Sequence, residues 1–191
     1  MDREIELRLV ARLKGGDPAA FEAVYEAYRP RLFGFLVRLS RRRDVAEDLL
    51  EETWLRLVTR TATLDDDARL GPWLFAVARN LYFSWRRSRA VDAARTSDLD
   101  PSWPAPERGD SPFEAVARAE LERSVEAALG RLALHDREVL LLVGVLGLTP
   151  AEAAGVCGLP AVTLRARLHR ARERLAAEMG ADHVRPKAKA G

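Results

Sequence analysis

The stretch from Thr149 to Met179 decides the fold of this chain, and it reads TPAEAAGVCGLPAVTLRARLHRARERLAAEM. Thr149 is a favoured N-cap residue, and Pro150 stands at the first helical position. Glu152 follows Thr149 by three residues, which completes a capping box. The sequence therefore predicts that a short helix begins at this point.

A longer helix begins near Ala161, after a break that Gly155, Gly158 and Pro160 are expected to make. Its apolar residues recur at helical spacing and predict a stripe that faces a core. The stripe consists of Leu164, Leu168, Ala171 and Leu175. Two helices joined by a compact turn that contains glycine predict a helix-turn-helix.

The second of these helices is rich in arginine, which suits a nucleic-acid partner. Arginine contacts phosphates anywhere along such a helix, whereas only the N-terminal part of the helix reaches base edges. The alternative is a surface helix with solvated arginines, in which Arg170 pairs with Glu173 and Arg174 with Glu178. We favour DNA because arginine exceeds acid on a helix that follows a compact turn.

Composition restricts the class of protein. The chain has 191 residues, 48% of them hydrophobic and 31% charged, which fits one globular domain or two small ones. A formal net charge of +2 excludes a uniformly basic DNA-binding protein. The charge is segregated instead: residues 44–52 hold acids and no base, and residues 72–89 hold arginines and no acid.

Several other classes find no support in the sequence. Cys157 is the only cysteine, so no internal disulfide can form, and a reducing cytoplasm is expected. One cysteine and three scattered histidines do not make a zinc site. We find no signal peptide, no apolar run that spans a bilayer and no catalytic arrangement. We therefore expect no enzyme activity, no cofactor and no membrane insertion.

The N-terminal third is predicted to be helical. A first helix carries Ile5, Leu9 and Leu13 on one face, and Asp17-Pro18 begins a second, in which Pro30 is expected to cause a kink or a break. A third helix is predicted to start with a capping box at Asp44 to Glu47 and to bury Val45, Leu49, Leu57 and Val58.

The third helix has a cluster of acids at its start, which are Asp44, Glu47, Asp48, Glu51 and Glu52. The helix dipole favours acids in the first turns and is one explanation for the cluster. Glu51 and Glu52 lie further along the helix, where this explanation is weaker. The other explanation is an acidic surface that binds a basic partner.

A fourth helix is predicted to begin at Pro72, after a polar connection over residues 59–71. One face interleaves basic and aromatic side chains, namely Phe75, Arg79, Tyr82, Phe83 and Arg86. Such a face suits single-stranded nucleic acid, because arginines contact the backbone while rings stack on bases. The alternative is that the aromatic rings pack in a core.

The second half of the chain follows an acidic segment with several prolines, which predicts a flexible linker. A helix should then run from a capping box at Ser111 to about Gly130, and an apolar helix over residues 137–146 should form the core beneath the helix-turn-helix. We predict an all-α protein with two small helical domains. The expected boundaries are 1–90, a linker over 91–112, 113–179, and a basic tail over 180–191.

These segments, in this order, resemble the extracytoplasmic-function sigma factors of the bacterial sigma-70 family. Residues 17–28 resemble the start of region two, and residues 44–55 resemble the segment that binds polymerase. Trp73-Leu74 and Ala78-Arg79-Asn80 resemble the helix that melts promoters and reads the minus-ten element. Residues 132–140, 149–154 and 163–172 resemble region four, which reads the minus-thirty-five element.

The resemblance implies a transcription initiation factor without catalytic activity of its own. Its implied partners are promoter DNA, an anti-sigma factor and core RNA polymerase, through the clamp helices of the largest subunit and the flap of the second-largest subunit. The acidic cluster would bind polymerase, and the basic and aromatic face together with Asn80 would bind the minus-ten strand. The minus-thirty-five contacts would be Thr163, Arg165, Arg167 and Arg170.

Three residues depart from the pattern of the family: Ser84 stands where an acid is usual, Ala133 where proline is usual, and Val162 where glycine is usual. An alternative function is a dimeric helix-turn-helix regulator that acts without being a polymerase subunit. That alternative gives the acidic cluster and the arginine-aromatic face no shared role.

Overall fold

The computed structural model describes residues 3–89 and 112–184, and every regular element in these ranges is a helix. The N-terminal region contains α1 (Arg3–Lys14), α2 (Pro18–Ser40), α3 (Arg43–Arg60), the short 3-10 helix η1 (Thr61–Thr63) and α4 (Leu70–Arg89). The C-terminal region contains α5 (Pro112–Arg131), α6 (Leu134–Leu140), the π-helical segment η3 (Leu141–Val145), α7 (Pro150–Cys157) and α8 (Ala161–Val184). The predicted all-α class is confirmed. Nearly all of the predicted linker, the cap at Ser111 and the end of the tail lie outside the described residues.

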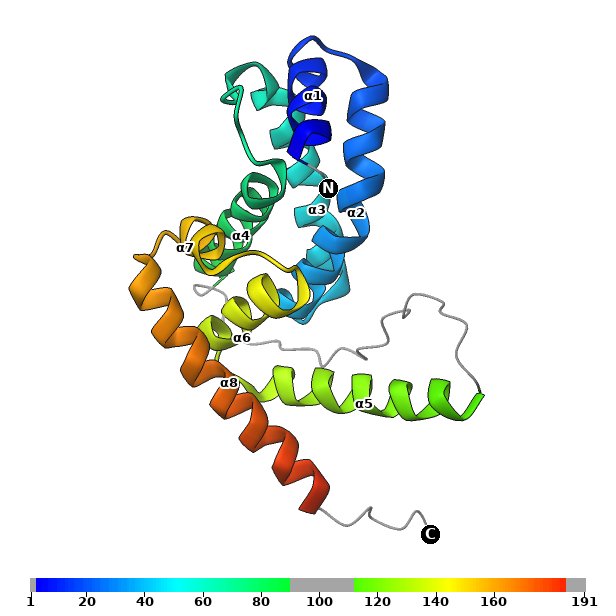
Figure 1. Ribbon diagram of the computed structural model, residues 1–191, viewed down its shortest axis with the longest axis vertical. Helices are drawn as coiled ribbons and strands as arrows, with labels where there is room; N and C mark the ends of the chain where they lie inside the picture. The colour runs from blue at the N-terminus through cyan, green and yellow to red at the C-terminus, as the bar shows by residue number, and fades with distance from the viewer. Residues whose placement is uncertain (1–2, 90–111, 185–191) are drawn as a thin grey trace.

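In the N-terminal region, α2, α3 and α4 pack on one another and α1 lies along α2 (Figure 1). The shared core includes Phe35 and Phe75, whose rings meet edge to face with centroids 5.6 Å apart. Asp17 caps α2 as expected, since its carboxylate accepts from the Ala19 amide at 2.9 Å. A break at Pro30 does not occur, because α2 continues through this residue to Ser40.

Two helix starts differ from the sequence prediction. The helix α3 begins at Arg43, and no side chain caps it. The Asp44 carboxylate instead accepts hydrogen bonds from the Arg42 guanidinium, so the predicted capping box is wrong. The helix α4 begins at Leu70, two residues before Pro72, because the Leu70 amide donates to the buried carboxylate of Glu6 at 2.8 Å. This acceptor comes from α1, so no local pattern could have indicated it.

The C-terminal region is built around α6 and η3, which lie beneath α8, while α5 packs across α8 (Figure 1). The apolar helix predicted over residues 137–146 is present and begins earlier, at Leu134. Its buried side chains include Val139 and Leu142, which share one core with Leu164 and Leu168 of α8. The predicted apolar stripe of α8 is therefore confirmed.

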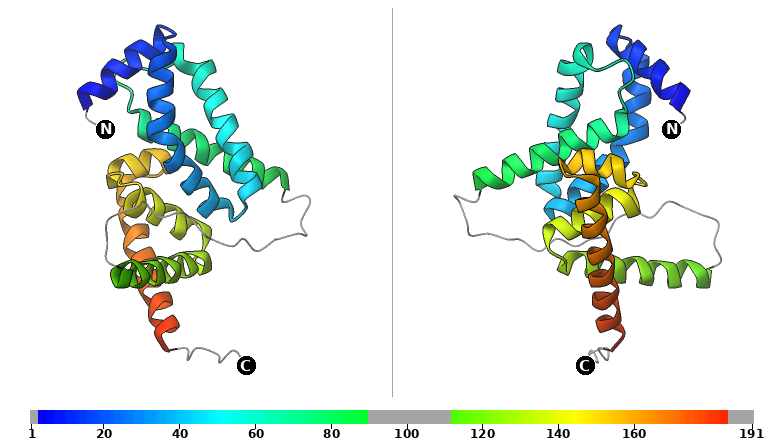
Figure 2. Two further views of the ribbon diagram at one scale, coloured as in Figure 1. Left: turned by 90° about the vertical axis from the view of Figure 1, so that its right-hand side faces the viewer. Right: turned by 60° about the vertical axis from the view of Figure 1, so that its left-hand side comes forward.

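The two regions contact each other directly. Figure 2 shows α7 beside α4, and α6 also touches α2. A cavity of about 140 Å³ lies at this boundary and is lined by polar groups that include Tyr28, Arg31 and Arg69. Within residues 3–89 and 112–184, no helix is both long and apolar enough to cross a membrane. The described side chains also form no group of ligands that could hold a metal ion.

Candidate nucleic-acid and partner-binding surfaces

The helix-turn-helix predicted from residues 149–179 is present. The Glu152 amide donates to the Thr149 hydroxyl at 3.2 Å, and the Thr149 amide donates to the Glu152 carboxylate at 2.8 Å, so the capping box is complete. Gly155 lies inside α7 and does not break it. The helix ends instead at Gly158, whose φ of 64° lies in the left-handed region that favours glycine. The turn then leads into α8 at Ala161.

Most of the predicted duplex-binding residues lie on the open side of α8. Thr163, Arg165 and Arg170 are exposed, and Arg167 is half-buried. Opposite them, Leu164 and Leu168 are buried in the core. The residues therefore stand where a partner can reach them, on the face away from the core.

The acids near α8 do not neutralise these arginines. Glu173 Oε1 lies 3.4 Å from His169 Nε2, Glu178 pairs with Arg131 at 2.6 Å, and Arg174 pairs with Asp136. The pairs expected for a merely solvated helix, Arg170 with Glu173 and Arg174 with Glu178, are not the ones that form. Among the described residues, Arg165, Arg167 and Arg170 take part in no ion pair.

Val162 belongs to the same surface and was not predicted as a site residue. It is the second residue of α8, and its apolar side chain is 72% exposed. The sequence pattern indicates only that the family usually has glycine at this position. A valine here adds a methyl-bearing side chain at the end of the helix that can reach base edges.

The five acids of α3 fall into two groups. Asp44 is held by Arg42, Glu47 pairs with Arg43 at 2.9 Å, and Glu52 pairs with Arg56 at 2.7 Å. Asp48 and Glu51 are exposed, and within the described part of the chain neither has an ion-pair partner. The sequence prediction treated all five alike, whereas the structure leaves these two available to a partner.

Two apolar residues extend this surface along α3. Leu55 and Val58 are 56% and 58% exposed and follow Asp48 and Glu51 at helical spacing. The prediction that Val58 faces the core is wrong. Its spacing fits the core stripe of α3 only loosely, and Leu57 takes the buried place. Exposed apolar residues beside unpaired acids are typical of a protein-binding surface.

The arginine-aromatic face of α4 is divided by burial. Phe75 and Tyr82 are core side chains, as the alternative interpretation expected. Arg79 and Phe83 are half-buried, whereas Asn80 and Arg86 are exposed. The Arg79 guanidinium lies 4.5 Å from the centre of the Phe83 ring, so a cation and a ring share one surface.

Two residues of this surface, Arg79 and Phe83, contact side chains of α6. Arg79 forms an ion pair with Glu138, whose side chain is fully buried. The Phe83 ring stacks on His135, with centroids 5.5 Å apart and planes 9° from parallel. His135 Nδ1 also lies 3.2 Å from the Glu138 carboxylate. We call this four-residue cluster of Arg79, Phe83, His135 and Glu138 the α4–α6 contact.

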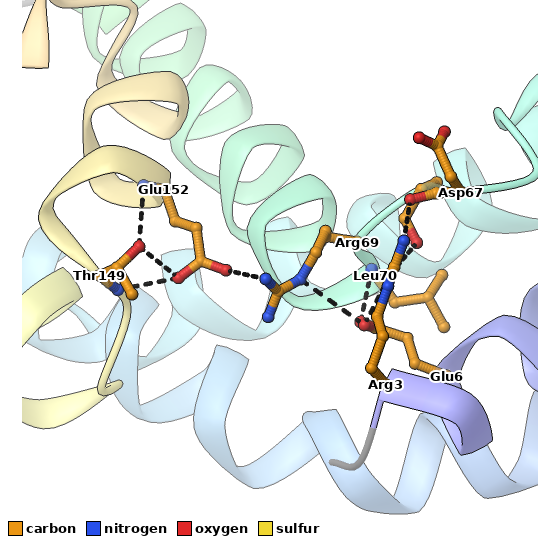
Figure 3. Close-up of polar contacts among 8 residues, drawn as sticks. Arg3, Glu6, Asp67, Arg69, Leu70, Thr149 and Glu152 are labelled. Atoms are coloured by element: carbon orange, nitrogen blue, oxygen red, sulfur yellow. Dashed lines mark hydrogen bonds and ion pairs between the residues drawn. The ribbon is translucent and has the colours of Figure 1, made fainter.

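A second contact joins the two regions through Arg69, in the connection before α4 (Figure 3). The Arg69 guanidinium lies 2.9 Å from the Glu152 carboxylate on one side and 3.7 Å from Glu6 on the other. Burial raises the pKa of Glu152, but hydrogen bonds from Thr149 and the charge of Arg69 together lower it below the ordinary value. Glu152 therefore caps α7 and holds Arg69 with one carboxylate.

Further arginines reach across the boundary. Arg31 donates to the Leu146 carbonyl at 2.6 Å, Arg38 pairs with Glu126, and Arg41 donates to the Gly130 carbonyl at 3.2 Å.

Cys157 is buried at the end of α7. Desolvation, with a smaller effect of the Glu138 charge, raises the pKa of its thiol to about 12. The thiol is therefore protonated at neutral pH.

Comparison with known proteins matches both regions of the chain to family models. Residues 24–91 match the model described as Sigma-70 region 2, and residues 122–175 match the model described as Sigma-70, region 4. The first match covers most of α2 and all of α3 and α4, and the second covers the helix-turn-helix.

The chain is also similar to individual proteins. It is 35% identical over 153 residues to the ECF RNA polymerase sigma factor EcfG of Rhodopseudomonas palustris, covering 80% of this chain and 81% of that protein. It superposes with a TM-score of 0.70 on CnrH in complex with the cytosolic domain of CnrY, at 25% identity over 93% of this chain and 99% of that one. The sigma factor RpoE of Bartonella quintana, in complex with the anti-sigma factor NepR, also gives 0.70, at 26% identity over 85% and 98%.

Proposed function

This chain belongs to the extracytoplasmic-function sigma factors of the sigma-70 family, and from that premise we propose a division of promoter recognition between its two regions. It is a transcription initiation factor, and its relatives are regulatory proteins rather than enzymes. The main support for the proposal is that the two matched regions follow each other in this order along the chain. Each region also has a surface that is suited to a different partner.

The open face of α3 docks on core RNA polymerase. Asp48 and Glu51 supply negative charge that internal ion pairs do not neutralise, and Leu55 and Val58 supply apolar area beside it. The clamp helices of the largest polymerase subunit, which the family resemblance indicates, would present a basic surface to these carboxylates. Charge complementarity then sets orientation and speeds association, while the apolar area adds affinity.

The α4 helix and the preceding connection bind the unpaired strand of the minus-ten element. Asn80 and Arg86 are exposed on α4, and Arg79 and Phe83 form the cation and ring that a base and its phosphate would meet. Phe75 and Tyr82 hold this face in place from the core. Extracting a base from the stack costs a few kcal/mol, which such contacts offset.

The α8 helix binds the minus-thirty-five element in the major groove, with Thr163, Arg165, Arg167 and Arg170 toward the DNA. The flap of the second-largest polymerase subunit would hold this region at its place on the promoter. Two weak DNA contacts on one chain gain from effective concentration once polymerase fixes their separation. We propose domain boundaries of 1–90 and 113–179 for these two functions.

An anti-sigma factor is the proposed regulator, because RpoE of Bartonella quintana is crystallised with one. The proposed place of action is the cytoplasm, where bacterial polymerase and the chromosome meet. The dimeric regulator is the less favoured alternative, since it leaves the unpaired acids of α3 without a role.

Transcription in vitro tests the proposed function. The purified chain added to core polymerase should give initiation at selected promoters, and the chain alone should bind duplex DNA weakly. Selection of promoters from genomic fragments would supply the templates. Tight binding of a dimer to a palindrome, with no initiation on adding core polymerase, would reject the proposal in favour of the dimeric regulator.

Replacing Arg167 or Arg170 with alanine should weaken binding to the upstream promoter element. A residue that reads a base contributes about 1–3 kcal/mol, and one that contacts only phosphate lowers the salt dependence of binding instead. Filter binding by the holoenzyme at several salt concentrations separates the two cases. The matched control is Arg172→Ala, an exposed arginine of α8 outside the proposed contact set. If the affinity and its salt dependence both stay unchanged, the tested arginine is solvated and does not contact the DNA.

A further inference from the structure

The connection between α3 and α4 (residues 61–69) is the segment that we assign, together with α4, to the minus-ten strand. Its own backbone forms short turns, in which the Leu64 amide donates to the Thr61 carbonyl at 3.2 Å and the Ala68 amide donates to the Asp65 carbonyl at 3.0 Å. Turns of this size do not fix the path of a whole segment relative to the helices around it. The groups that hold the connection in place come from α1.

The start of α1 holds the end of the connection (Figure 3). The Arg3 guanidinium donates to the Asp67 carbonyl at 2.5 Å and to the Ala68 carbonyl at 3.2 Å. The buried Glu6 carboxylate accepts from the Leu70 amide at 2.8 Å and from Arg3 at 3.2 Å. A buried carboxylate is costly unless it is paired and hydrogen-bonded, so Glu6 favours the one arrangement that supplies these partners. The point at which the connection enters α4 is therefore fixed by α1.

The last residue of α1 holds the start of the connection. Lys14 Nζ donates to the Leu64 carbonyl at 2.9 Å, and it also pairs with the Asp66 carboxylate. The Leu64 side chain is buried in the core, so the carbonyl that Lys14 contacts lies beside a fixed point of the structure. Lys14 thus ties the mobile-length part of the connection to the same helix that fixes its other end.

The geometry of α1 suits this task. Arg3, Glu6 and Lys14 fall on one face of the helix, within about 80° of one another at 100° per residue. The connection runs in the opposite direction to α1, since Lys14 meets its start and Arg3 its end. Between these two anchors, the side chains of residues 65–67 are exposed. The helix therefore fixes the backbone of the connection and leaves its other side open to a DNA strand.

The charges on α1 also match the composition of the connection. Asp65, Asp66 and Asp67 follow one another in a segment that would approach the phosphates of DNA, which repel carboxylates. Arg3 and Lys14 place two cations beside these acids. The hydrogen bond from Lys14, with a contribution from its charge, holds the pKa of Asp66 below its ordinary value. Cations therefore serve here better than neutral donors would, because they also reduce the repulsion.

We propose that Arg3, Glu6 and Lys14 are positioning residues, which set the path of the connection and thereby the base preference at the minus-ten element without touching DNA. This inference rests on the proposed function of α4 and the connection. A base that leaves the stack is read by a pocket, and the groups of such a site must be held within about 0.5 Å. With its anchors removed, the connection would still follow α4 to the strand but would discriminate poorly between bases.

The double variant Arg3→Met/Lys14→Met tests this role, because methionine keeps the apolar stem and removes the donors. Holoenzyme transcribes a promoter library that is randomised across the minus-ten element, and the transcripts are sequenced. Base preference should fall about fivefold or more at one or two adjacent positions, the size of effect that a lost base contact gives. Preference at the other minus-ten positions and at the minus-thirty-five element should stay the same. In the free chain, amides of residues 61–70 should exchange hydrogen faster than in the parent.

The matched control is Arg8→Met/Arg12→Met, which removes the same charge from the exposed side of α1. These arginines pair with Glu4 and Asp17 and not with the connection, so the base preference should match that of the parent.

Two further variants vary the anchors themselves. Arg3→Lys/Lys14→Arg keeps both charges and donors and should retain most of the preference. Glu6→Gln keeps an acceptor for the Leu70 amide and loses the charge, so it should give a smaller fall at the same positions.

Three results would overturn the inference. The first is a preference profile of Arg3→Met/Lys14→Met that equals the parent profile. The second is an equal loss at every position together with a lower unfolding midpoint, which is the result of a merely structural role. The third is a smaller salt dependence of promoter binding with unchanged preference, which would assign Arg3 and Lys14 to phosphate contacts. If the double variant does not fold, Lys14→Met alone is judged by the same criteria.

Substitutions in the connection itself separate this inference from the proposed function. If Thr63→Ala/Asp65→Ala alters the minus-ten preference while the α1 variants do not, the inference is rejected and the proposed function stands. If neither Thr63→Ala/Asp65→Ala nor Asn80→Ala alters that preference, the proposed function of α4 and the connection fails.

Discussion

Replacing Arg137 with methionine should destabilise the C-terminal region by about 3–5 kcal/mol. Arg137 is buried in α6, and its guanidinium donates to the carbonyls of Leu129, Gly130 and Leu132 at 2.9, 3.0 and 3.1 Å. These carbonyls lie at the end of α5, where the helix leaves acceptors unpaired and carries a partial negative charge. Methionine fills the space but donates nothing, so several buried acceptors lose their partner.

The same guanidinium also donates to the Arg38 carbonyl at the end of α2, at 3.2 Å. Burial, with a smaller contribution from the charge of Arg41, lowers the pKa of Arg137 below its ordinary value. The four carbonyl oxygens offset this cost in the folded state. Lysine at this position keeps the charge but not the planar fork, so Arg137→Lys should lose less stability than Arg137→Met.

Urea unfolding followed by two probes measures the effect. Trp54, Trp73 and Trp85 lie in the described N-terminal region, so their fluorescence follows this region, whereas far-UV circular dichroism follows both regions. Replacing Trp103, which lies outside the described residues, with phenylalanine in all variants removes its contribution. For Arg137→Met, the dichroism midpoint should fall well below that of the parent. The control is Arg172→Met on the exposed face of α8, which should change stability by less than about 0.5 kcal/mol. Equal midpoints for the two variants would show that the carbonyl contacts contribute little.

The double charge reversal Asp48→Arg/Glu51→Arg should lower affinity for core polymerase at least 100-fold, which corresponds to about 2.8 kcal/mol. Placing positive charge against a basic docking surface adds repulsion to the loss of two attractions. Both side chains are exposed, and among the described residues neither forms an ion pair, so the fold should survive. Fluorescence titration with labelled polymerase gives the affinity, and urea unfolding checks stability.

The matched control is Glu22→Arg/Glu26→Arg on the exposed face of α2. It makes the same change in net charge. Any effect of net charge alone on affinity for polymerase should therefore appear equally in both double variants. Its affinity should remain within about threefold of the parent, which corresponds to less than about 0.7 kcal/mol. A loss of equal size in both double variants would count against a specific docking role for α3.

Local patterns predicted the parts of this fold that local interactions determine. The capping box of Thr149 and Glu152, the cap at Asp17 and the buried stripe of α8 all depend on residues close in sequence, and all are present. The start of α4 was misplaced because its cap is Glu6, which is 64 residues away. Pro30 did not break α2, since tertiary packing can override helix propensity.

The surfaces were harder to predict than the helices. Periodicity places Phe75 and Phe83 on neighbouring faces of α4, but it cannot say which ring meets the core of its own region and which meets another region. Glu138 lies in an apolar run, and its role depends on Arg79, which is 59 residues away. The division of the α3 acids into paired and unpaired groups likewise depends on which arginine rotamers reach them.

The uncovered face of α3 has a consequence for the cell. Leu55 and Val58 leave apolar area open to water on this face, and exposed apolar area favours association with other proteins. Under the proposed function, a chain that polymerase has not engaged would keep this area open, and any protein that occupies it would compete directly with the enzyme.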